Sequence, residues 1–231
     1  MTFRTASGQD VPVRFEVNPR AKRLILRLDQ KNREAVAVAP SKRQLKAAAA
    51  FAEQRLDWLA SCLESVPDVQ TLSEGAVIPL RGVPTHITAA GTGRLPRLQE
   101  GDPPVLSLPG APETLNARAL RYLKREARTD LTRAVDHYAT QLGVTYRRIS
   151  VKDTRSRWGS CSAEGNLSFS WRLILAEPFV LDYVAAHEVA HLIEMNHSPA
   201  FWAHVEKIYP DWRYASGWLK AHGSSLHAVG A

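Results

Sequence analysis

Cysteine is scarce in this sequence, which contains only Cys62 and Cys161 among 231 residues. Two widely separated cysteines do not make the disulfide framework of a small secreted protein, and they favour a reducing compartment. Long apolar runs are also missing, since none approaches the roughly 20 residues that span a bilayer. The first residues, Met1 to Arg4, lack the apolar core of a signal peptide. We therefore expect a cytoplasmic protein with no membrane-spanning segment.

Negative charge is in short supply, and the deficit is concentrated in one part of the chain. The sequence has 30 Lys and Arg against 23 Asp and Glu, a net charge of +7. Residues 118–157 carry eleven basic and four acidic residues, whereas residues 1–117 have a net charge of +3 and residues 158–231 of −3. Such a basic segment favours polyanionic partners, including weak binding of nucleic acid, nucleotide phosphates or acidic protein. A solvated basic helix face is the alternative, and composition alone does not choose.

One pattern among the histidines predicts a metal site. Residues 187–191 match the HExxH pattern, and His197 follows six residues later. On a helix, His187 and His191 lie on one face with their β-carbons roughly 5–6 Å apart, so both imidazoles can bind one zinc ion. Glu188 projects to the flank, where its carboxylate reaches a metal-bound water without binding the metal.

His197 joins this site only if the helix ends before it, because a continuous helix would carry it about 9 Å beyond His191 at 1.5 Å per residue. Asn196 tolerates the conformation that ends helices, and Ser198-Pro199 is a helix-start signal. Three protein ligands leave a fourth position for water, as in catalytic zinc sites. The alternative is three unrelated histidines that match the pattern by chance.

The N-terminal half of the sequence predicts a β-rich region with one helix. Three strands of a meander are expected in residues 11–39, and a helix follows from Ser41 to about Ser65. Proline and glycine then separate short apolar pieces, with a hairpin expected through Arg81-Gly82. The expected strands of this second group are residues 77–80, 83–88 and 105–108. We place a boundary near residue 110, which gives an N-terminal region of residues 1–110.

Residues 111–231 predict a second, more helical region. A long helix is expected from Pro112 to Leu142, and Gly143 ends it. A strand at residues 148–152 and a hairpin of residues 157–161 with 167–173 form a small antiparallel sheet. Helices follow, one opened by Pro178 that carries the HExxH pattern, then residues 199–208 and 211–222. The whole sequence therefore predicts an α+β fold.

The second region resembles the YgjP-like family, bacterial zincin-type metal-dependent hydrolases related to the SprT-like and WLM metalloproteases. The resemblance is close over about residues 150–205, and its longest unbroken match is residues 157–162. The other matching residues are Asn166, Trp171-Arg172-Leu173, Pro178, Asp182-Tyr183-Val184, His187-Glu188, His191, Asn196-His197-Ser198 and Phe201-Trp202. It implies a zincin-like catalytic domain in residues 111–231.

The resemblance also implies roles for individual residues. His187, His191 and His197 would bind one metal ion, and Glu188 would be the catalytic glutamate. Zinc is the expected ion for imidazole ligands, while nickel, cobalt and iron are compatible with them. A metzincin is not expected: that group has glycine at the position of Glu194, and no methionine follows His197 to form its Met-turn.

These residues predict a zinc metallopeptidase in which Glu188 is the general base. A peptide substrate would pair with an edge strand near Ser160 or Ser168. The oxyanion needs a further donor. Its candidates are Arg157, Arg172, Tyr183 and His204. For the two arginines the alternative is a structural ion pair, for His204 an exposed helix position, and Cys161 is expected to be a small buried residue.

Two other functions remain open at this stage. The first is a nucleotide phosphohydrolase or pyrophosphatase that uses the same metal and glutamate, with the basic segment 118–157 holding the phosphates. The second is a nucleic-acid-associated protease of the SprT or WLM type, which rests on analogy with those relatives. The residues predict a peptide, protein or nucleotide substrate, and they leave the oligomeric state open.

Overall fold

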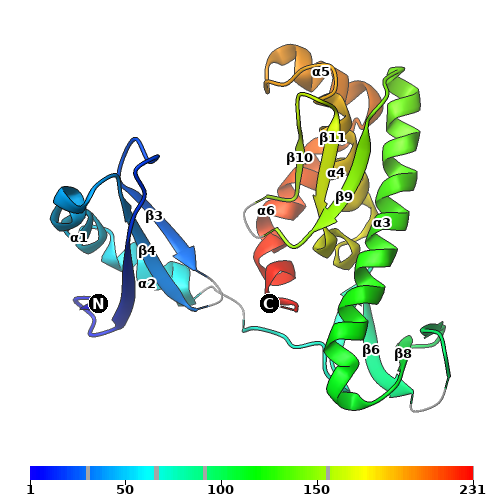
Figure 1. Cartoon of the computed structure of the whole chain (residues 1–231), viewed down its shortest axis with the longest axis horizontal. Helices are drawn as coiled ribbons and strands as arrows, with labels where there is room; N and C mark the ends of the chain where they lie inside the picture. Colours follow the sequence, from blue (N-terminus) through cyan, green and yellow to red (C-terminus); the bar gives the residue numbers. More distant parts are fainter. Residues whose placement is uncertain (30–31, 65–67, 91–92, 155–156, 231) are drawn as a thin grey trace. The chain divides into compact units, whose positions relative to one another are not determined.

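The computed structural model describes residues 1–29, 32–64, 68–90, 93–154 and 157–230 (Figure 1). The chain divides into two compact units, Met1–Val69 and Gln70–Ala231, called unit 1 and unit 2 below. The sequence placed the boundary near residue 110 instead. Residues 70–110 belong to unit 2 because the apolar side chains of their strands share a core with the helix that follows. The predicted α+β class is confirmed.

Unit 1 is built on a four-stranded sheet with the order β1-β2-β4-β3. The three strands predicted for residues 11–39 are confirmed, but they do not form a meander. β4 lies between its neighbours, parallel to β2 and antiparallel to β3. Five of its six residues are buried, which an edge position would not allow. The strands are β1 (Thr2–Arg4), β2 (Asp10–Val17), β3 (Ile25–Asp29) and β4 (Glu34–Ala39).

The single helix predicted from Ser41 is divided into three pieces, and its predicted end at Ser65 lies outside the described residues. Buried side chains nevertheless recur at helical spacing from Ala48 to Leu63 and pack on the core of unit 1. Because the apolar pattern runs through the break, periodicity predicts one continuous helix. The pieces are η1 (Lys42–Gln44), α1 (Leu45–Glu53) and α2 (Leu56–Glu64).

Unit 2 begins with a second four-stranded sheet, whose order is β5-β6-β8-β7. The predicted hairpin through Arg81-Gly82 is confirmed, with φ angles of 53° and 79° that a tight two-residue turn requires. β7 was not predicted, because its three residues are all exposed and show no alternation. The strands are β5 (Val77–Leu80), β6 (Val83–Ala90), β7 (Arg97–Gln99) and β8 (Val105–Pro109).

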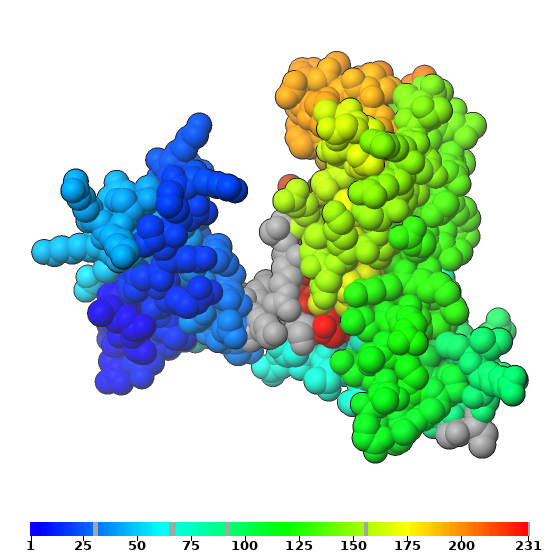
Figure 2. Space-filling view, in the orientation of Figure 1, coloured from blue at the N-terminus to red at the C-terminus, as the bar shows by residue number. Residues whose placement is uncertain are grey.

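The longest element of unit 2 is the predicted helix, seen as η2 (Pro112–Thr114) and α3 (Leu115–Leu142). Its apolar stripe is buried from Leu115 to Tyr138. Gly143 ends the helix in the left-handed conformation, with φ of 66°. The opposite face of α3 is open to solvent along the length of the helix, as the green band in Figure 2 shows.

A smaller sheet with the order β10-β11-β9 packs beside α3 and completes the frame of the site. It is mixed rather than antiparallel, because β11 is antiparallel to β10 and parallel to β9. The strand predicted for residues 167–173 ends at Ser170, and the buried run that follows is a 3₁₀ helix. Pattern alone does not separate these two structures. The elements are β9 (Arg148–Lys152), β10 (Gly159–Cys161), β11 (Asn166–Ser170) and η3 (Trp171–Leu175).

Three helices follow, namely α4 (Pro178–Ala190), α5 (Pro199–Ile208) and α6 (Trp212–Ala228). α4 is buried on nearly every side and contacts both α3 and β10 (Figure 1). It therefore runs through the core of unit 2 and carries the HExxH residues into the interior. Within the described part of the chain, no helix is both long and apolar enough to cross a membrane.

Candidate metal centre

The HExxH residues lie where α4 ends. His187 and Glu188 belong to its last turn, and His191 is the residue that caps it, still with helical angles of −65° and −16°. The α4 side chains around them, from Val180 to Ala190, are almost all buried. The packed core therefore fixes the backbone that presents His187, Glu188 and His191.

The chain reverses between His191 and His197, as the spacing predicted. Turns follow α4 directly, and α5 begins at Pro199. Ser198 is the N-cap of α5, because its side-chain oxygen accepts a hydrogen bond from the Phe201 N–H at 3.2 Å. Pro199 occupies the first helical position, where its missing N–H costs little. This restart brings His197 back over the end of α4.

The three imidazoles converge on one point. One nitrogen from each of His187, His191 and His197 lies within 4.8 Å of the other two. Nε2 of His187 is 3.0 Å from Nε2 of His197. A tetrahedral zinc ion with bonds of about 2.0–2.1 Å separates its ligand nitrogens by about 3.3 Å. The donor set and its spacing therefore fit one metal ion of this kind.

Other groups orient these rings. Nδ1 of His191 lies 3.0 Å from the backbone oxygen of Glu194, so it donates there when it carries the ring proton, and Nε2 is left free. Nδ1 of His187 is buried and has no hydrogen-bond partner among the described residues. Burial, with the neighbouring histidines, lowers the pKa of His187 to about 3 and also lowers that of His191. Both rings are therefore neutral at pH 7, the form that binds metals.

Glu188 is a buried carboxyl group, only 5% exposed. Its Oε2 has no hydrogen-bond partner among the described residues. Burial raises the pKa of Glu188 to about 8, and the charge of Arg157 partly opposes that shift. A carboxyl group with this affinity for a proton suits general acid–base chemistry.

Gly159 on β10 creates the space that Glu188 occupies, a role that the sequence analysis missed. A β-carbon at this position would lie 2.6 Å from Cγ and 2.7 Å from Cδ of Glu188. Real β-carbons essentially never show such contacts, so a side chain here would force Glu188 to shift. Glycine inside a predicted strand is a signal of close approach by another group. The residue type therefore pointed to a close contact, but its partner was not visible from the sequence.

Aromatic side chains form one wall of the site. The Phe201 ring stacks on His191, with ring centres 4.4 Å apart, and meets His187 and His197 edge-on. Trp202 lies 5.8 Å from His187 and stacks on Trp212 of α6 at 4.1 Å. The same helix that supplies the cap behind His197 thus supplies the apolar surface that holds the three rings.

The histidines open into a cleft of about 250 Å³ that strand β10 borders. β10 is an edge strand of its sheet, so its outer backbone groups have no strand partner among the described residues. Ser160 is therefore at an edge, whereas Ser168 lies on the central strand β11 and its hydroxyl contacts Ser150 at 2.8 Å. Cys161 also lines the cleft and is partly buried, and burial beside Glu188 raises the pKa of its thiol to about 11.

Arg172 and Arg157 differ completely in their surroundings. Arg172 is fully buried, donates to the backbone oxygen of Val229 at 3.0 Å and forms an ion pair with Asp153. It is thus a structural residue and no longer an oxyanion candidate, because its guanidinium is already engaged. Arg157 is exposed, and its charge acts on Glu188.

The other two candidates for the oxyanion donor, Tyr183 and His204, lie at different distances from the site. Tyr183 is buried one turn before His187 on α4, with ring centres 5.9 Å apart, and burial raises the pKa of its hydroxyl group. His204 is half-buried on α5 and is not among the residues that line the cleft. The structure thus brings Arg157 and Tyr183 near the site and leaves His204 outside the cleft.

Comparison with known proteins gives one family and one solved structure. The family model described as YgjP-like, metallopeptidase domain, matches residues 22–222. None of the curated proteins matches the chain. The crystal structure of the metallopeptidase zymogen of Pyrococcus abyssi abylysin is similar at 21% identity over 39% of this chain and 92% of that chain, with a TM-score of 0.37. A TM-score this low does not establish a shared fold.

Proposed function

Since the chain belongs to the YgjP-like metallopeptidase family and is a metal-dependent hydrolase, we propose that it is a zinc peptidase with its ion held by His187, His191 and His197. The observation that carries the proposal is the convergence of three imidazoles beside one buried carboxyl group. Three imidazoles favour zinc, although nickel, cobalt and iron accept the same ligands. When bound, the ion supplies a Lewis acid that lowers the pKa of a water ligand to about 7.

Glu188 is the proposed general base. Its carboxylate accepts a proton from the attacking water and then donates that proton to the leaving amine of the peptide. Two observations support this role, namely the absence of a partner for Oε2 among the described residues and the burial that raises the pKa of the group. Gly159 gives the carboxyl group room and holds it on the β10 side of the cleft.

β10 is the proposed binding edge for the substrate. An extended peptide that pairs with the backbone of Ser160 would extend the small sheet by one strand. Such pairing uses backbone groups, so it tolerates many substrate sequences. Pairing at Ser168 is dropped, because β11 already has a strand on both sides.

Arg157 is the proposed donor to the oxyanion. Its guanidinium is exposed and has no hydrogen-bond or ion-pair partner within the described segments, while its charge acts on Glu188. A cation there stabilises the charge that develops on the attacked carbonyl oxygen. Tyr183 is the second candidate, but it is buried and is not among the residues that line the cleft.

Nucleotide hydrolysis at the same centre has less support. Its cleft is lined by no lysine or arginine among the described residues, and the single charge of Arg157, which acts on Glu188 from outside that lining, does not match a chain of phosphates. Phosphoryl-transfer sites also favour carboxylates and Mg²⁺ over three imidazoles. The arginines of the basic segment would have to act from outside this cleft.

The experiment compares wild type with Glu188→Gln on an unfolded protein and on a panel of nucleoside triphosphates. Glu177→Gln is the matched control, because Glu177 is exposed at the other end of α4. We expect peptide cleavage by wild type and by Glu177→Gln, and none by Glu188→Gln. Phosphate or pyrophosphate release without peptide cleavage would reject the peptidase.

A further inference from the structure

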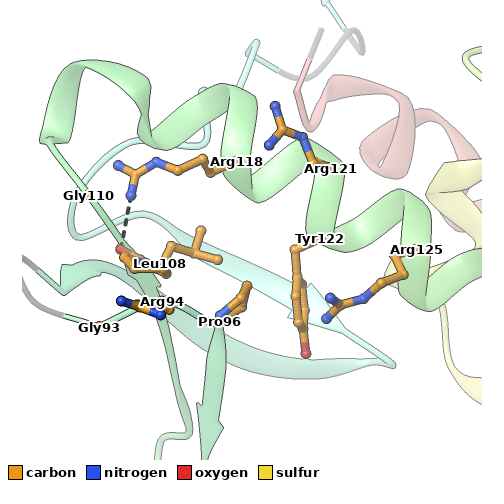
Figure 3. Close-up of a pocket in the computed structure, with 10 residues that line it drawn as sticks. Gly93, Arg94, Pro96, Leu108, Gly110, Arg118, Arg121, Tyr122 and Arg125 are labelled. Carbon is orange, nitrogen blue, oxygen red and sulfur yellow. Dashed lines mark hydrogen bonds between the residues drawn. The ribbon is translucent and has the colours of Figure 1, made fainter.

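A second concave site lies in unit 2, between α3 and the sheet of β7 and β8 (Figure 3). It is a cavity of about 450 Å³, within the range of small-molecule binding sites. None of the residues that line the metal cleft lines this cavity. It is therefore separate from the proposed catalytic centre.

Positive charge dominates this cavity. Four arginines line it, and no aspartate or glutamate does so among the described residues. In Figure 3, Arg118, Arg121 and Arg125 come from α3, whereas Arg94 comes from the segment before β7. Pro96, Leu108 and the ring of Tyr122 give the cavity an apolar floor.

Arg118 is built into the wall by its backbone contacts. Its Nη1 donates to the oxygen of Leu108 at 3.3 Å, shown dashed in Figure 3, and its Nε donates to the oxygen of Thr114 at 3.3 Å. Gly110 makes this possible, because a β-carbon there would lie 2.6 Å from Nη1. The charge of Arg118 is thus held at a fixed position.

The other three guanidinium groups have capacity left for a ligand. Arg125 lies over the Tyr122 ring at 5.2 Å, and its ion pair with Glu126 is long at 3.4 Å. Glu126 is itself bound by Arg81 at 3.0 Å. For Arg94 and Arg121 no hydrogen-bond or ion-pair partner exists within the described ranges. Planar guanidinium groups without partners match phosphate oxygens in paired hydrogen bonds.

We propose that this cavity binds a compact polyphosphate group, either free in solution or as the phosphates of a nucleotide. In Figure 3 the guanidinium group of Arg121 is directed away from those of Arg94, Arg118 and Arg125, and several phosphates in one small volume balance these three charges better than one carboxylate does. The concave shape favours a small ligand over a nucleic acid, which needs an extended basic track. Other arginines of the basic segment are used elsewhere, as Arg128 donates to the oxygen of Ile149 at 3.3 Å and Arg133 contacts Asp130 at 3.7 Å.

The test is isothermal titration of the whole chain with pyrophosphate, tripolyphosphate, a nucleoside triphosphate and a short DNA duplex. The test variant Arg94→Gln/Arg125→Gln removes one charge from each side of the cavity. The control Arg97→Gln/Arg133→Gln removes the same charge from β7 and α3, and Arg133, like Arg125, has a long ion pair, at 3.7 Å. Unchanged melting temperatures establish that both variants fold.

We expect a polyphosphate to bind wild type, with affinity at least about tenfold weaker in the test variant and within about twofold of wild type in the control. His187→Ala should bind like wild type, which separates this cavity from polyphosphate held by a metal at the histidines. Equal affinity for tripolyphosphate and the nucleotide identifies phosphate alone as the ligand, and tighter nucleotide binding adds the nucleoside.

Three results would overturn the proposal. They are no binding of any polyphosphate, equal weakening by the test and control variants, and loss of binding in His187→Ala. Binding of the duplex but not of the small polyphosphates would also reject it, in favour of a nucleic-acid surface. None of these results depends on peptidase activity, so this proposal and the proposed function can fail separately.

Discussion

Gly159 and Glu188 are in direct contact, and the missing side chain of one makes the position of the other possible. A β-carbon on Gly159 would lie 2.6 Å from Cγ and 2.7 Å from Cδ of Glu188. The edge strand and the active-site helix are therefore fitted together at the proposed general base.

Gly159→Ala should displace the Glu188 carboxyl group and lower turnover by about 100-fold, the effect of a misplacement of roughly 1 Å. Metal content should stay normal, because the three atoms nearest to a β-carbon at Gly159 all belong to Glu188 and none to a histidine. Gly217→Ala is the control, since no atom lies within 4 Å of a β-carbon at this α6 position. Steady-state peptide hydrolysis measures the effect, and near-normal turnover of Gly159→Ala would refute it.

Ser198→Ala should destabilise the protein by about 1 kcal/mol, because it removes the cap that accepts from the Phe201 N–H at 3.2 Å. His197 directly precedes this cap, so metal affinity should fall as well. Ser198→Asp keeps an oxygen that accepts this hydrogen bond, so it should retain most of the stability and most of the metal affinity. Urea unfolding and competition with a chelator measure the two effects. If Ser198→Ala binds metal as tightly as wild type, the cap does not position His197.

Arg172→Met should lower the free energy of unfolding by about 3 kcal/mol, because it removes the buried guanidinium that pairs with Asp153 and donates to two backbone oxygens, those of Val229 and Gly230. The metal content of the folded fraction should not change. Arg213→Gln is the control: it removes an ion pair with Glu206 that is exposed, and such pairs contribute about 0–1 kcal/mol. A stable Arg172→Met protein without activity would instead return Arg172 to the catalytic candidates.

Asp182→Asn should stabilise the protein at pH 7, with a gain that shrinks as the pH falls towards 4. Burial raises the pKa of Asp182, so the folded state binds the proton more tightly than the unfolded state. Stability from this group is therefore present below the unfolded pKa and lost as the pH rises. Asp57→Asn, on an exposed part of α2, is the control. Urea unfolding at both pH values gives the difference, and a loss of stability at pH 7 would contradict the argument.

The sequence predicted the local features that carry the site. The chain reversal between His191 and His197 was predicted because a continuous helix would carry His197 too far from His191, and because Ser198-Pro199 is a helix-start signal. The structure has this reversal, and α5 starts at Pro199. Local signals also gave the hairpin at Arg81-Gly82 and the end of α3 at Gly143.

The sequence did not predict which strands pair when they lie far apart along the chain. The insertion of β4 between β2 and β3 depends on contacts between distant residues, and the boundary at residue 110 failed because β5, β6 and β8 share the core of α3. The sequence shows the cluster of basic residues in 118–157. It did not predict the arginine-lined cavity, because Arg94, which completes that cavity, lies outside this segment.

The central claim is that His187, His191 and His197 hold one metal ion beside Glu188. Metal analysis of purified wild type and of His187→Ala, His197→Ala and Glu188→Gln tests this most directly, with His204→Ala as control. We predict about one zinc ion per chain in wild type, Glu188→Gln and His204→Ala, and almost none in the other two. Metal-free wild type, or a full zinc content in His197→Ala, would contradict it.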